Sequence, residues 1–442
     1  MYNPQIETMA RSEMESLQVE RLQNTVRLVY ENVEFYRNKF SEIGITPDDI
    51  KCLDDILRLP FTKKQDLRDH YPYGLFAVPQ ERLVRIHASS GTSGKPTVVG
   101  YTENDLKVWS EIVARSIVAA GGKKTDIFHN AYGYGLFTGG LGLHYGAEML
   151  GAAVIPISGG NTERQITVIE DFKPRGICGT PSYILNIGEK MLEMGKDPRE
   201  TSVEYGIFGA EPWSEEMRTK LEEMFNLKAV DIYGLSEIMG PGVSIECAEA
   251  QDGLHVQEDH FFVEVIDPMT LEPVSDGEIG ELVFTSLTKE AFPVLRYRTG
   301  DLASLSREKC SCGRTTVRMS RVKGRTDDMI IIRGVNIFPS EIERVLLQID
   351  GLVPHFQIHL IRNGAMDEAV LHVEIESKLY EEIGQDLSHE RVSKIKKEIQ
   401  RVMKSTCLVT INTVFNIPKA IPRSEGKAAR IVDLRDSKAV VV

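Results

Sequence analysis

The chain has 442 residues, 42% of them hydrophobic and 26% charged, which allows two or three domains with sizeable cores. A formal net charge of −13 argues against nucleic acid and anionic membranes as partners, because both favour a basic surface. No run approaches the ~20 apolar residues that span a bilayer, and the polar start lacks the features of a signal peptide, so a cytoplasmic protein is expected.

Residues 1–80 are expected to form a helical lead-in, because apolar residues between positions 16 and 40 recur at spacings near 3.6. From about residue 85, short β-rich runs alternate with amphipathic helical segments, which is typical of layered α/β domains with largely parallel sheets. Strand-like runs separated by turn signals then predict a β-rich subdomain at about 245–320. Together these segments predict a large N-terminal domain, residues 1–325.

After residue 325 the sequence pattern becomes typical of a compact α+β unit. An amphipathic helix is expected at 340–351, with Ser340 as its N-cap three residues before Glu343. Alternating strand patterns follow, together with a long charged helix over 389–405. We therefore expect a small C-terminal domain, residues 326–442.

A loop rich in glycine and hydroxyl residues, SSGTSGKPT at 89–97, follows a strand-like run. Its backbone N–H groups, its hydroxyls and Lys95 are the parts needed to hold a polyphosphate, although such stretches are also common as flexible turns. A Walker A loop fits poorly, because only two residues separate Gly91 from Gly94 and Pro96 follows Lys95.

This loop resembles the phosphate loop of the adenylate-forming superfamily. Further segments match that superfamily in the expected order, namely GAEPW (209–213), DIYGLSE (231–237), YRTGD (297–301), GRTDD (324–328) and PRSEGKAAR (422–430). Longer runs, such as YGYGLFTGGLGLHYG, TSLTKEAFPVLRYRTGDL and GRTDDMIIIRGVNIFPSEIE, resemble phenylacetate–CoA ligases across most of the chain. The resemblance implies an ATP-dependent ligase that activates an aryl acid as an acyl-adenylate and then forms an acyl-CoA thioester, AMP and pyrophosphate.

The resemblance also implies roles for particular residues. It assigns catalysis to Lys427, Glu237 and Lys95, with Mg²⁺ held by Glu237. Tyr233 would lie against adenine, and Asp301 and Arg325 would contact the ribose. The full set that it assigns to ATP is Ser89, Ser90, Gly91, Thr92, Ser93, Gly94, Lys95, Gly209, Ala210, Glu211, Pro212, Asp231, Ile232, Tyr233, Gly234, Ser236, Glu237, Asp301 and Arg325.

The acid and coenzyme A are assigned in the same way. The resemblance places Tyr132, Tyr134, Phe137, Gly209, Ile232 and Pro241 around the aryl acid, although each aromatic residue could equally belong to the core. In the family the small C-terminal domain is mobile and turns after adenylation, here about Asp327. The turn brings the segment with Arg333, Gly334 and Val335 toward coenzyme A.

Two other clusters stand out. Five basic residues within a dozen positions could concentrate positive charge for an anionic cofactor, but composition alone favours a solvated strand or loop: Arg314, Arg318, Arg321, Lys323 and Arg325. The Cys310-x-Cys312 hook, with Cys247 and His255 upstream, suits a structural Zn²⁺, with His260 as a substitute for His255. The alternative is that these cysteines are free thiols, reduced in a chain without a signal peptide.

Two other functions stay open at this stage. An adenylating enzyme that loads a carrier protein would share the same motifs, and a regulatory or zinc-scaffold protein that binds ATP would not need Lys427. The acid itself stays open among phenylacetate, its hydroxylated forms, indoleacetate and benzoates. A homodimer is also compatible with the sequence.

Overall fold

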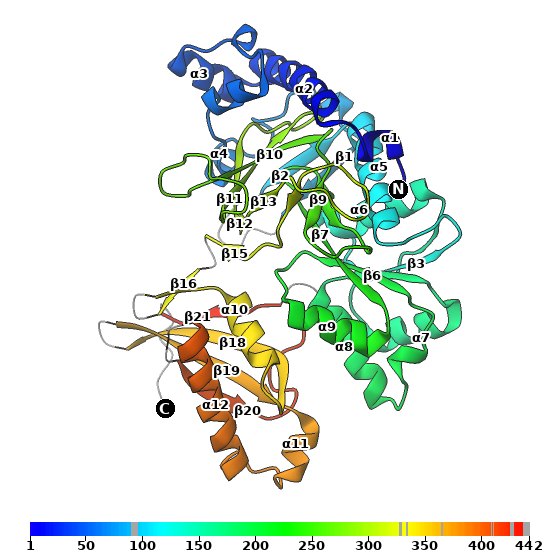
Figure 1. The fold of residues 1–442 in the computed structure, drawn as a ribbon, viewed down its shortest axis with the longest axis vertical. Helices are drawn as coiled ribbons and strands as arrows, with labels where there is room; N and C mark the ends of the chain where they lie inside the picture. The colour runs from blue at the N-terminus through cyan, green and yellow to red at the C-terminus, as the bar shows by residue number, and fades with distance from the viewer. Residues whose placement is uncertain are drawn as a thin grey trace.

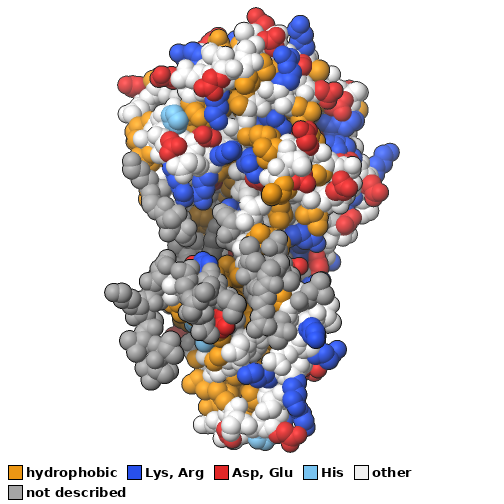
Figure 2. Space-filling model, turned by 90° about the vertical axis from the view of Figure 1, so that its left-hand side faces the viewer, with side chains coloured by type: hydrophobic (Ala, Val, Ile, Leu, Met, Phe, Trp, Pro, Cys, Tyr) orange, Lys and Arg blue, Asp and Glu red, His pale blue; other side chains and the backbone are white. Residues whose placement is uncertain are grey.

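The structure is a computed structural model, which describes residues 1–89, 96–326, 329–332, 335–363, 366–407, 409, 411–424 and 428–435. It confirms the predicted class: a large α/β body carries a small α+β domain at one end (Figure 1). Among the described residues, every helix is too short or too polar to cross a lipid bilayer. Basic and acidic side chains are interspersed over the large body on the face shown in Figure 2.

The N-terminal helices form a layer at the outer end of the large body (Figure 1). The longest of them, α2, buries Leu22, Val26 and Val29, which recur at helical spacing along one face. The layer consists of α1 (Pro4–Glu7), α2 (Arg11–Asn32), α3 (Glu34–Ile43) and α4 (Lys64–Asp69), with 3₁₀ turns at Pro47–Asp49, Leu53–Arg58 and Gln80–Arg82.

A nine-stranded sheet, in the order β13-β14-β9-β8-β7-β6-β5-β3-β4, forms the centre of the large body. Strands β3 to β7 are parallel, and β8 onward are antiparallel. The strands are β3 (Ile127–Asn130), β4 (Ala153–Ile155), β5 (Gly176–Gly179), β6 (Tyr205–Gly209), β7 (Lys228–Leu235), β8 (Gly240–Glu246), β9 (Leu254–Val256), β13 (Leu305–Ser306) and β14 (Arg318–Met319). The connecting helices are α5 (Glu103–Ala119), α6 (Thr138–Leu150), α7 (Thr162–Phe172), α8 (Pro181–Glu193) and α9 (Glu215–Phe225), with a 3₁₀ turn at Pro198–Glu200.

The segment at 245–320 is rich in strands, but these strands divide between two sheets. Strands β9, β13 and β14 extend the central sheet, whereas β10 (Phe261–Ile266), β11 (Gly280–Ser286) and β12 (Tyr297–Ala303) pair with β15 (Gly324–Arg325) in a separate antiparallel sheet. A hairpin of β1 (Arg85–Ala88) and β2 (Val98–Tyr101) flanks the glycine-rich loop. The β-rich segment is therefore joined to the main body through the shared sheet.

The small domain has its own core around a sheet ordered β20-β19-β18-β21. Its elements are β16 (Ile330–Ile332), β17 (Val335–Ile337), α10 (Pro339–Leu347), β18 (Leu352–Asn363), β19 (Met366–Ile375), α11 (Ser377–Glu382), α12 (Glu390–Thr406), β20 (Asn412–Asn416) and β21 (Ile431–Asp433). The predicted cap of α10 is wrong. Phe338 is the N-cap, its N–H donates to Glu341, and Ser340 lies inside the helix and donates to the carbonyl of Lys323.

Candidate active site

The parallel neighbours β6 and β7 bring the segments around Gly209 and Tyr233, at their carboxyl ends, to one edge of the central sheet. We call this the nucleotide edge, because its residues are expected to bind ATP. The strands approach so closely there that a Cβ on Gly209 would lie 2.2 Å from the carbonyl oxygen of Ile232. A Cβ on Gly234 would lie 1.9 Å from the carbonyl oxygen of Gly240. Glycine is therefore required at both positions, and Ala210 follows in a left-handed conformation with φ 69°.

Three of the residues expected at the nucleotide meet through one carboxylate. The Tyr233 hydroxyl donates to Asp301 Oδ2 at 2.7 Å, and Arg325 donates to Asp301 Oδ1 at 2.6 Å. The pairing of β12 with β15 sets Asp301 opposite Arg325, which fixes this geometry in the backbone. Burial, followed by the negative charge of Asp301, raises the pKa of Tyr233 well above its usual value.

Glu237, the residue expected to hold Mg²⁺, is buried beside Ser236, whose hydroxyl lies 3.1 Å from that of Thr138. Lys289 is buried close by, over the ring of Tyr101 at 4.5 Å, and its amine has no hydrogen-bond partner among the described residues. Burial lowers the pKa of Lys289 to about 8 against the opposing charges of Asp105 and Glu237. The sequence did not indicate Lys289, because only tertiary packing distinguishes it from a surface lysine.

Glu211 joins the two domains at this edge. Its Oε1 accepts from the backbone N–H of Ser182 at the start of α8, and its Oε2 accepts from the N–H of Ala428 in the small domain, both at 2.9 Å. Ala428 directly follows Lys427, so the segment expected to carry the catalytic lysine is attached to the nucleotide edge. Several predicted residues lie outside the described ranges: Ser90, Gly91, Thr92, Ser93, Gly94, Lys95, Asp327, Arg333, Gly334 and Lys427. Ser89, the first residue of the glycine-rich loop, lies within the described ranges, and Val335 begins β17.

The prediction that the basic run at 314–325 is solvated is wrong for its arginines. Arg314 and Arg318 are buried and pair with Glu7 at 2.7 Å and Asp252 at 2.6 Å. Arg321 lies 4.4 Å from the ring of Trp213 and pairs with Glu215 at 3.0 Å. Each arginine therefore neutralises an acid of an acidic protein, which composition alone could not indicate.

Asp231 belongs to the same charged network below the nucleotide edge. Burial, followed by the negative charge of Glu246, raises the pKa of Asp231 to about 7. Glu246 is itself bound by Arg218, with both carboxylate oxygens at 2.8 Å from the same guanidinium nitrogen. The negative charge of Asp231 is therefore less well compensated than that of Glu246.

The residues expected around the acid differ in exposure. Tyr132 and Ile232 are buried in the main core, whereas Phe137 is exposed and packs its ring over Gly139. The Tyr134 hydroxyl accepts from Asn130 at 2.9 Å and lies 3.1 Å from His144 Nδ1. The carbonyl of Pro241 accepts from the Trp109 indole at 3.0 Å. The residues expected around the acid therefore do not share one environment: some lie in the core, and Phe137 is exposed.

The four predicted zinc ligands come together. The ligand atoms of Cys247, His255, Cys310 and Cys312 all lie within 4.8 Å of one another. Two sulfurs, of Cys247 and Cys310, are 3.7 Å apart, and the Cys312 sulfur lies 3.4 Å from His255 Nε2. Tetrahedral bonds of about 2.3 Å to sulfur and 2.0 Å to nitrogen would place such pairs about 3.8 and 3.5 Å apart.

The surroundings of this cluster also suit a metal. The other ring nitrogen of His255 lies 3.2 Å from the Thr316 hydroxyl, which orients the imidazole. His260, the alternative ligand, instead lies 2.8 Å from Thr288 Oγ1 and 3.0 Å from Asp259 Oδ2. The donor set is therefore three sulfurs and one imidazole nitrogen, with His255 as the histidine.

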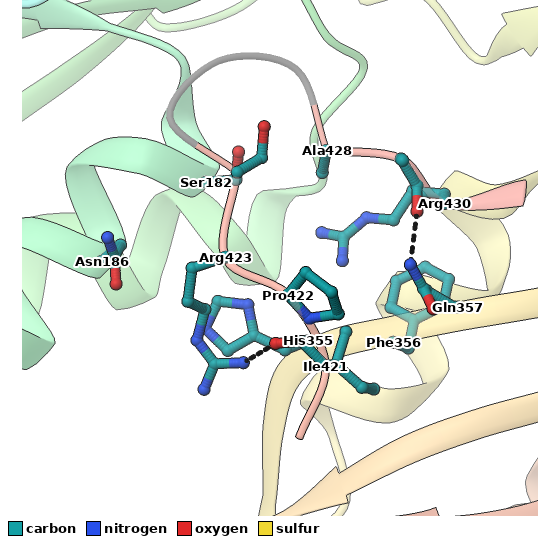
Figure 3. Close-up of a pocket in the computed structure, with 12 residues that line it drawn as sticks. Ser182, Asn186, His355, Phe356, Gln357, Ile421, Pro422, Arg423, Ala428 and Arg430 are labelled. Carbon is teal, nitrogen blue, oxygen red and sulfur yellow. Dashed lines mark hydrogen bonds between the residues drawn. The ribbon is translucent and has the colours of Figure 1, made fainter. Parts of the chain in front are cut away.

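A cavity of about 240 Å³ separates α8 from the small domain (Figure 3). Ser182 and Asn186 line its side on the large body, and His355 and Arg423 line the facing side. The rest of its lining includes residues 421–424 and 428–430, which flank Lys427 in the sequence. The two domains are therefore in contact without being fused into one core.

The sequence matches two known protein families, one in the large body and one in the small domain. A family described as AMP-binding enzyme matches residues 42–288, and one described as AMP-binding enzyme C-terminal domain matches residues 334–435. A phenylacetate-coenzyme A ligase of Thermus thermophilus is 54% identical over 98% of this chain and 100% of its own length.

Solved structures of a 2-hydroxyisobutyryl-CoA ligase match in two arrangements. Its postadenylation state, with an acyl-AMP bound, has a TM-score of 0.91 at 29% identity, covering 97% of this chain and 91% of that one. Its thioesterification state, with CoA, has a TM-score of 0.72 at 30% identity, covering 98% and 92%. The fold of this chain therefore matches the first arrangement better than the second.

Proposed function

Since the chain belongs to the AMP-binding enzyme family and, within it, to the AMP-forming acid–CoA ligases, we propose that its acid substrate is an arylacetate, with phenylacetate as the first choice. The activity is ATP-dependent ligation of an acid to coenzyme A. The observation that carries the choice of acid is the 54% identity to a phenylacetate-coenzyme A ligase over nearly the whole of both chains. The exposed ring of Phe137 above Gly139 offers an apolar surface for a flat ring.

ATP activates the acid because oxide is a poor leaving group and AMP is a good one. In the proposed site, Tyr233 faces the adenine, while Asp301 and Arg325 hold the ribose hydroxyls; the hydrogen bonds around the Asp301 carboxylate support this role. Lys95 and the N–H groups of its loop bind phosphate oxygens. These groups position ATP and the acid for in-line attack, and positioning with electrostatic stabilisation supplies most of the acceleration.

Glu237 is our candidate for the Mg²⁺ ligand, because it is a buried carboxylate at the nucleotide edge next to two hydroxyls. The ion would neutralise charge on the ATP phosphates. Lys427 would lie between the carboxylate and the α-phosphate. The bond from Glu211 to Ala428 supports that position, since it attaches the neighbouring residue to the nucleotide edge.

Thioester formation requires the small domain to turn, with Asp327 as the hinge and Arg333, Gly334 and Val335 moving toward coenzyme A. The two solved arrangements of the 2-hydroxyisobutyryl-CoA ligase support such a turn, and this chain resembles the postadenylation arrangement. The polar interface and the cavity beside α8 are also what a reversible contact needs. We place the domain boundary at 325–326.

We further propose a structural Zn²⁺ held by Cys247, His255, Cys310 and Cys312, because the distances among their sulfur and nitrogen atoms fit a tetrahedral site. The ion would clamp β8 and β9 to the loop before β14 and would take no part in the reaction. We also place the enzyme in the cytoplasm, where ATP and coenzyme A are available, and we retain a homodimer as a prediction for light scattering.

The test is a pyrophosphate-release assay with phenylacetate, 4-hydroxyphenylacetate, indoleacetate and benzoate, each with and without coenzyme A. We expect CoA-dependent turnover, with kcat/KM for phenylacetate at least about tenfold above that for benzoate, since one methylene changes the fit by that order. Pyrophosphate exchange without CoA-dependent turnover would favour an enzyme that loads a carrier protein. Equal turnover of all four acids would refute the arylacetate pocket.

A further inference from the structure

Four acidic side chains of the large body, on or near α8 and α9, each form a hydrogen bond or ion pair with the small domain. Glu189 contacts His355 Nε2 at 3.1 Å, and Glu211 accepts from the Ala428 N–H at 2.9 Å. Two outer contacts join Glu193 to Lys419 Nζ at 2.6 Å and Glu216 to Gln348 Nε2 at 3.0 Å. In all four, the acceptor belongs to the large body and the donor to the small domain.

The pair of Glu189 and His355 is the best shielded of the side-chain contacts. The His355 side chain is 8% exposed and that of Glu189 22%, against 61% and 39% for Lys419 and Glu193. Burial opposes ionisation of Glu189, but the hydrogen bond and charge of His355 outweigh it, so the pKa of Glu189 is lowered. Because it is shielded from water, we expect this pair to be stronger than the two outer contacts.

Apolar contacts contribute little to the rest of the interface. Leu347 of α10 packs against the core formed by α7, α8 and α9, but the cavity beside α8 leaves much of the contact open. Polar partners that are released into water regain their hydration, so a contact of this kind can be broken and remade at modest cost. A rigid turn of the small domain would separate Glu189 from His355, because they sit on different bodies.

We propose that His355 and Glu189 are positioning residues, which hold the small domain in the arrangement that forms the acyl-adenylate and separate when it turns to form the thioester. This inference rests on the proposed domain turn. His355 lies on the wall of the cavity that also contains the segments on either side of Lys427 (Figure 3). The pair therefore acts on the first half-reaction through the placement of that segment, without touching a substrate.

The test separates the two half-reactions in Glu189→Ala, His355→Ala and the double variant. Single-turnover acyl-adenylate formation is measured with ATP and phenylacetate, and thioester formation with supplied phenylacetyl-adenylate and coenzyme A. We expect adenylation to fall about tenfold in each single variant and no further in the double, as for one charge-assisted hydrogen bond. Thioester formation should stay within about twofold of the parent enzyme.

The matched control is Glu382→Ala, which removes an ion pair with Arg391 of 2.7 Å on the surface of the small domain. It should change neither half-reaction, and melting temperatures show whether each variant is folded. Equal losses in both half-reactions, additive losses in the double variant, or unchanged adenylation would each overturn the proposal. Ligase turnover of the parent enzyme is measured in the same assay, so failure of this pair is distinguishable from failure of the proposed function.

Discussion

The cysteine cluster and the nucleotide edge are assembled in opposite ways. The four cluster residues all belong to the large body, and their ligand atoms lie within 4.8 Å of one another. The nucleotide edge draws on β6, β7, β12 and β15, and it is completed by the segment around Ala428 from the small domain. A structural centre can be complete in every state of the enzyme, whereas our proposed domain turn would take the nucleotide edge apart once per turnover.

The largest expected effect comes from Lys427→Ala, which would break the nucleotide edge and leave the cluster intact. We expect acyl-adenylate formation to fall by at least about 10²-fold, because the variant loses the positive charge beside the α-phosphate in the transition state. Thioester formation from supplied acyl-adenylate and the melting temperature should hardly change. Lys394→Ala, which removes an exposed lysine of α12, is the control. Full adenylation by Lys427→Ala would show that the role of this lysine is misassigned.

The converse change, Cys310→Ser, would break the cluster and leave the nucleotide edge intact. Elemental analysis should find about one zinc per chain in the parent protein and far less in the variant. Loss of the metal should lower the melting temperature by at least about 5 °C, since the binding free energy of a structural ion contributes to folding. The adenylation rate at 25 °C should remain within a few-fold of that of the parent enzyme.

Cys52→Ser is the control for this experiment, because Cys52 is an exposed thiol that is not a member of the cluster. A parent protein free of zinc, with a melting temperature that Cys310→Ser leaves unchanged, would instead show four unmetallated side chains that merely pack together.

The same contrast explains what could be predicted from the sequence. The cluster was foreseeable because cysteine is rare and the Cys310-x-Cys312 hook is local, although spacing alone could not choose between His255 and His260. The choice depends on register: His255 lies in β9 opposite β14, and this pairing directs it to the cluster. Motif resemblance identified Tyr233, Asp301 and Arg325, which the structure brings together.

Other features had no sequence signal. Glu189 and His355 are ordinary residues of a helix and a strand, and only the docking of two domains pairs them. The arginines at 314–325 looked solvated, because their acidic partners, such as Glu7 and Asp252, are distant in the sequence. Fold class follows from local periodicity, but the partner of a charge depends on tertiary packing, which periodicity does not encode.

The smallest expected effect concerns the pH dependence of stability. The pKa of Asp231, beneath the nucleotide edge, is raised from 3.8 to about 7, chiefly by burial. Between these values the folded protein binds more protons than the unfolded chain, so the contribution of Asp231 to stability declines as pH rises from about 4 to 7 and stays unfavourable above. Asp231→Asn removes this cost. Its stability relative to the parent should therefore increase by about 2 kcal/mol between pH 5 and pH 8, as measured by urea unfolding.

Asp350→Asn is the control, since it makes the same chemical change at an acid that is exposed to water. If the difference for Asp231→Asn were constant with pH, Asp231 would not be the largely buried, poorly compensated acid that its surroundings, including Glu246 and Arg321, indicate. If the stability of Asp231→Asn relative to the parent increases with pH, the nucleotide edge holds an unfavourable charge when it is empty. Such a charge suits a site that is completed by a ligand, in contrast to a cluster whose four residues already satisfy one another's geometry.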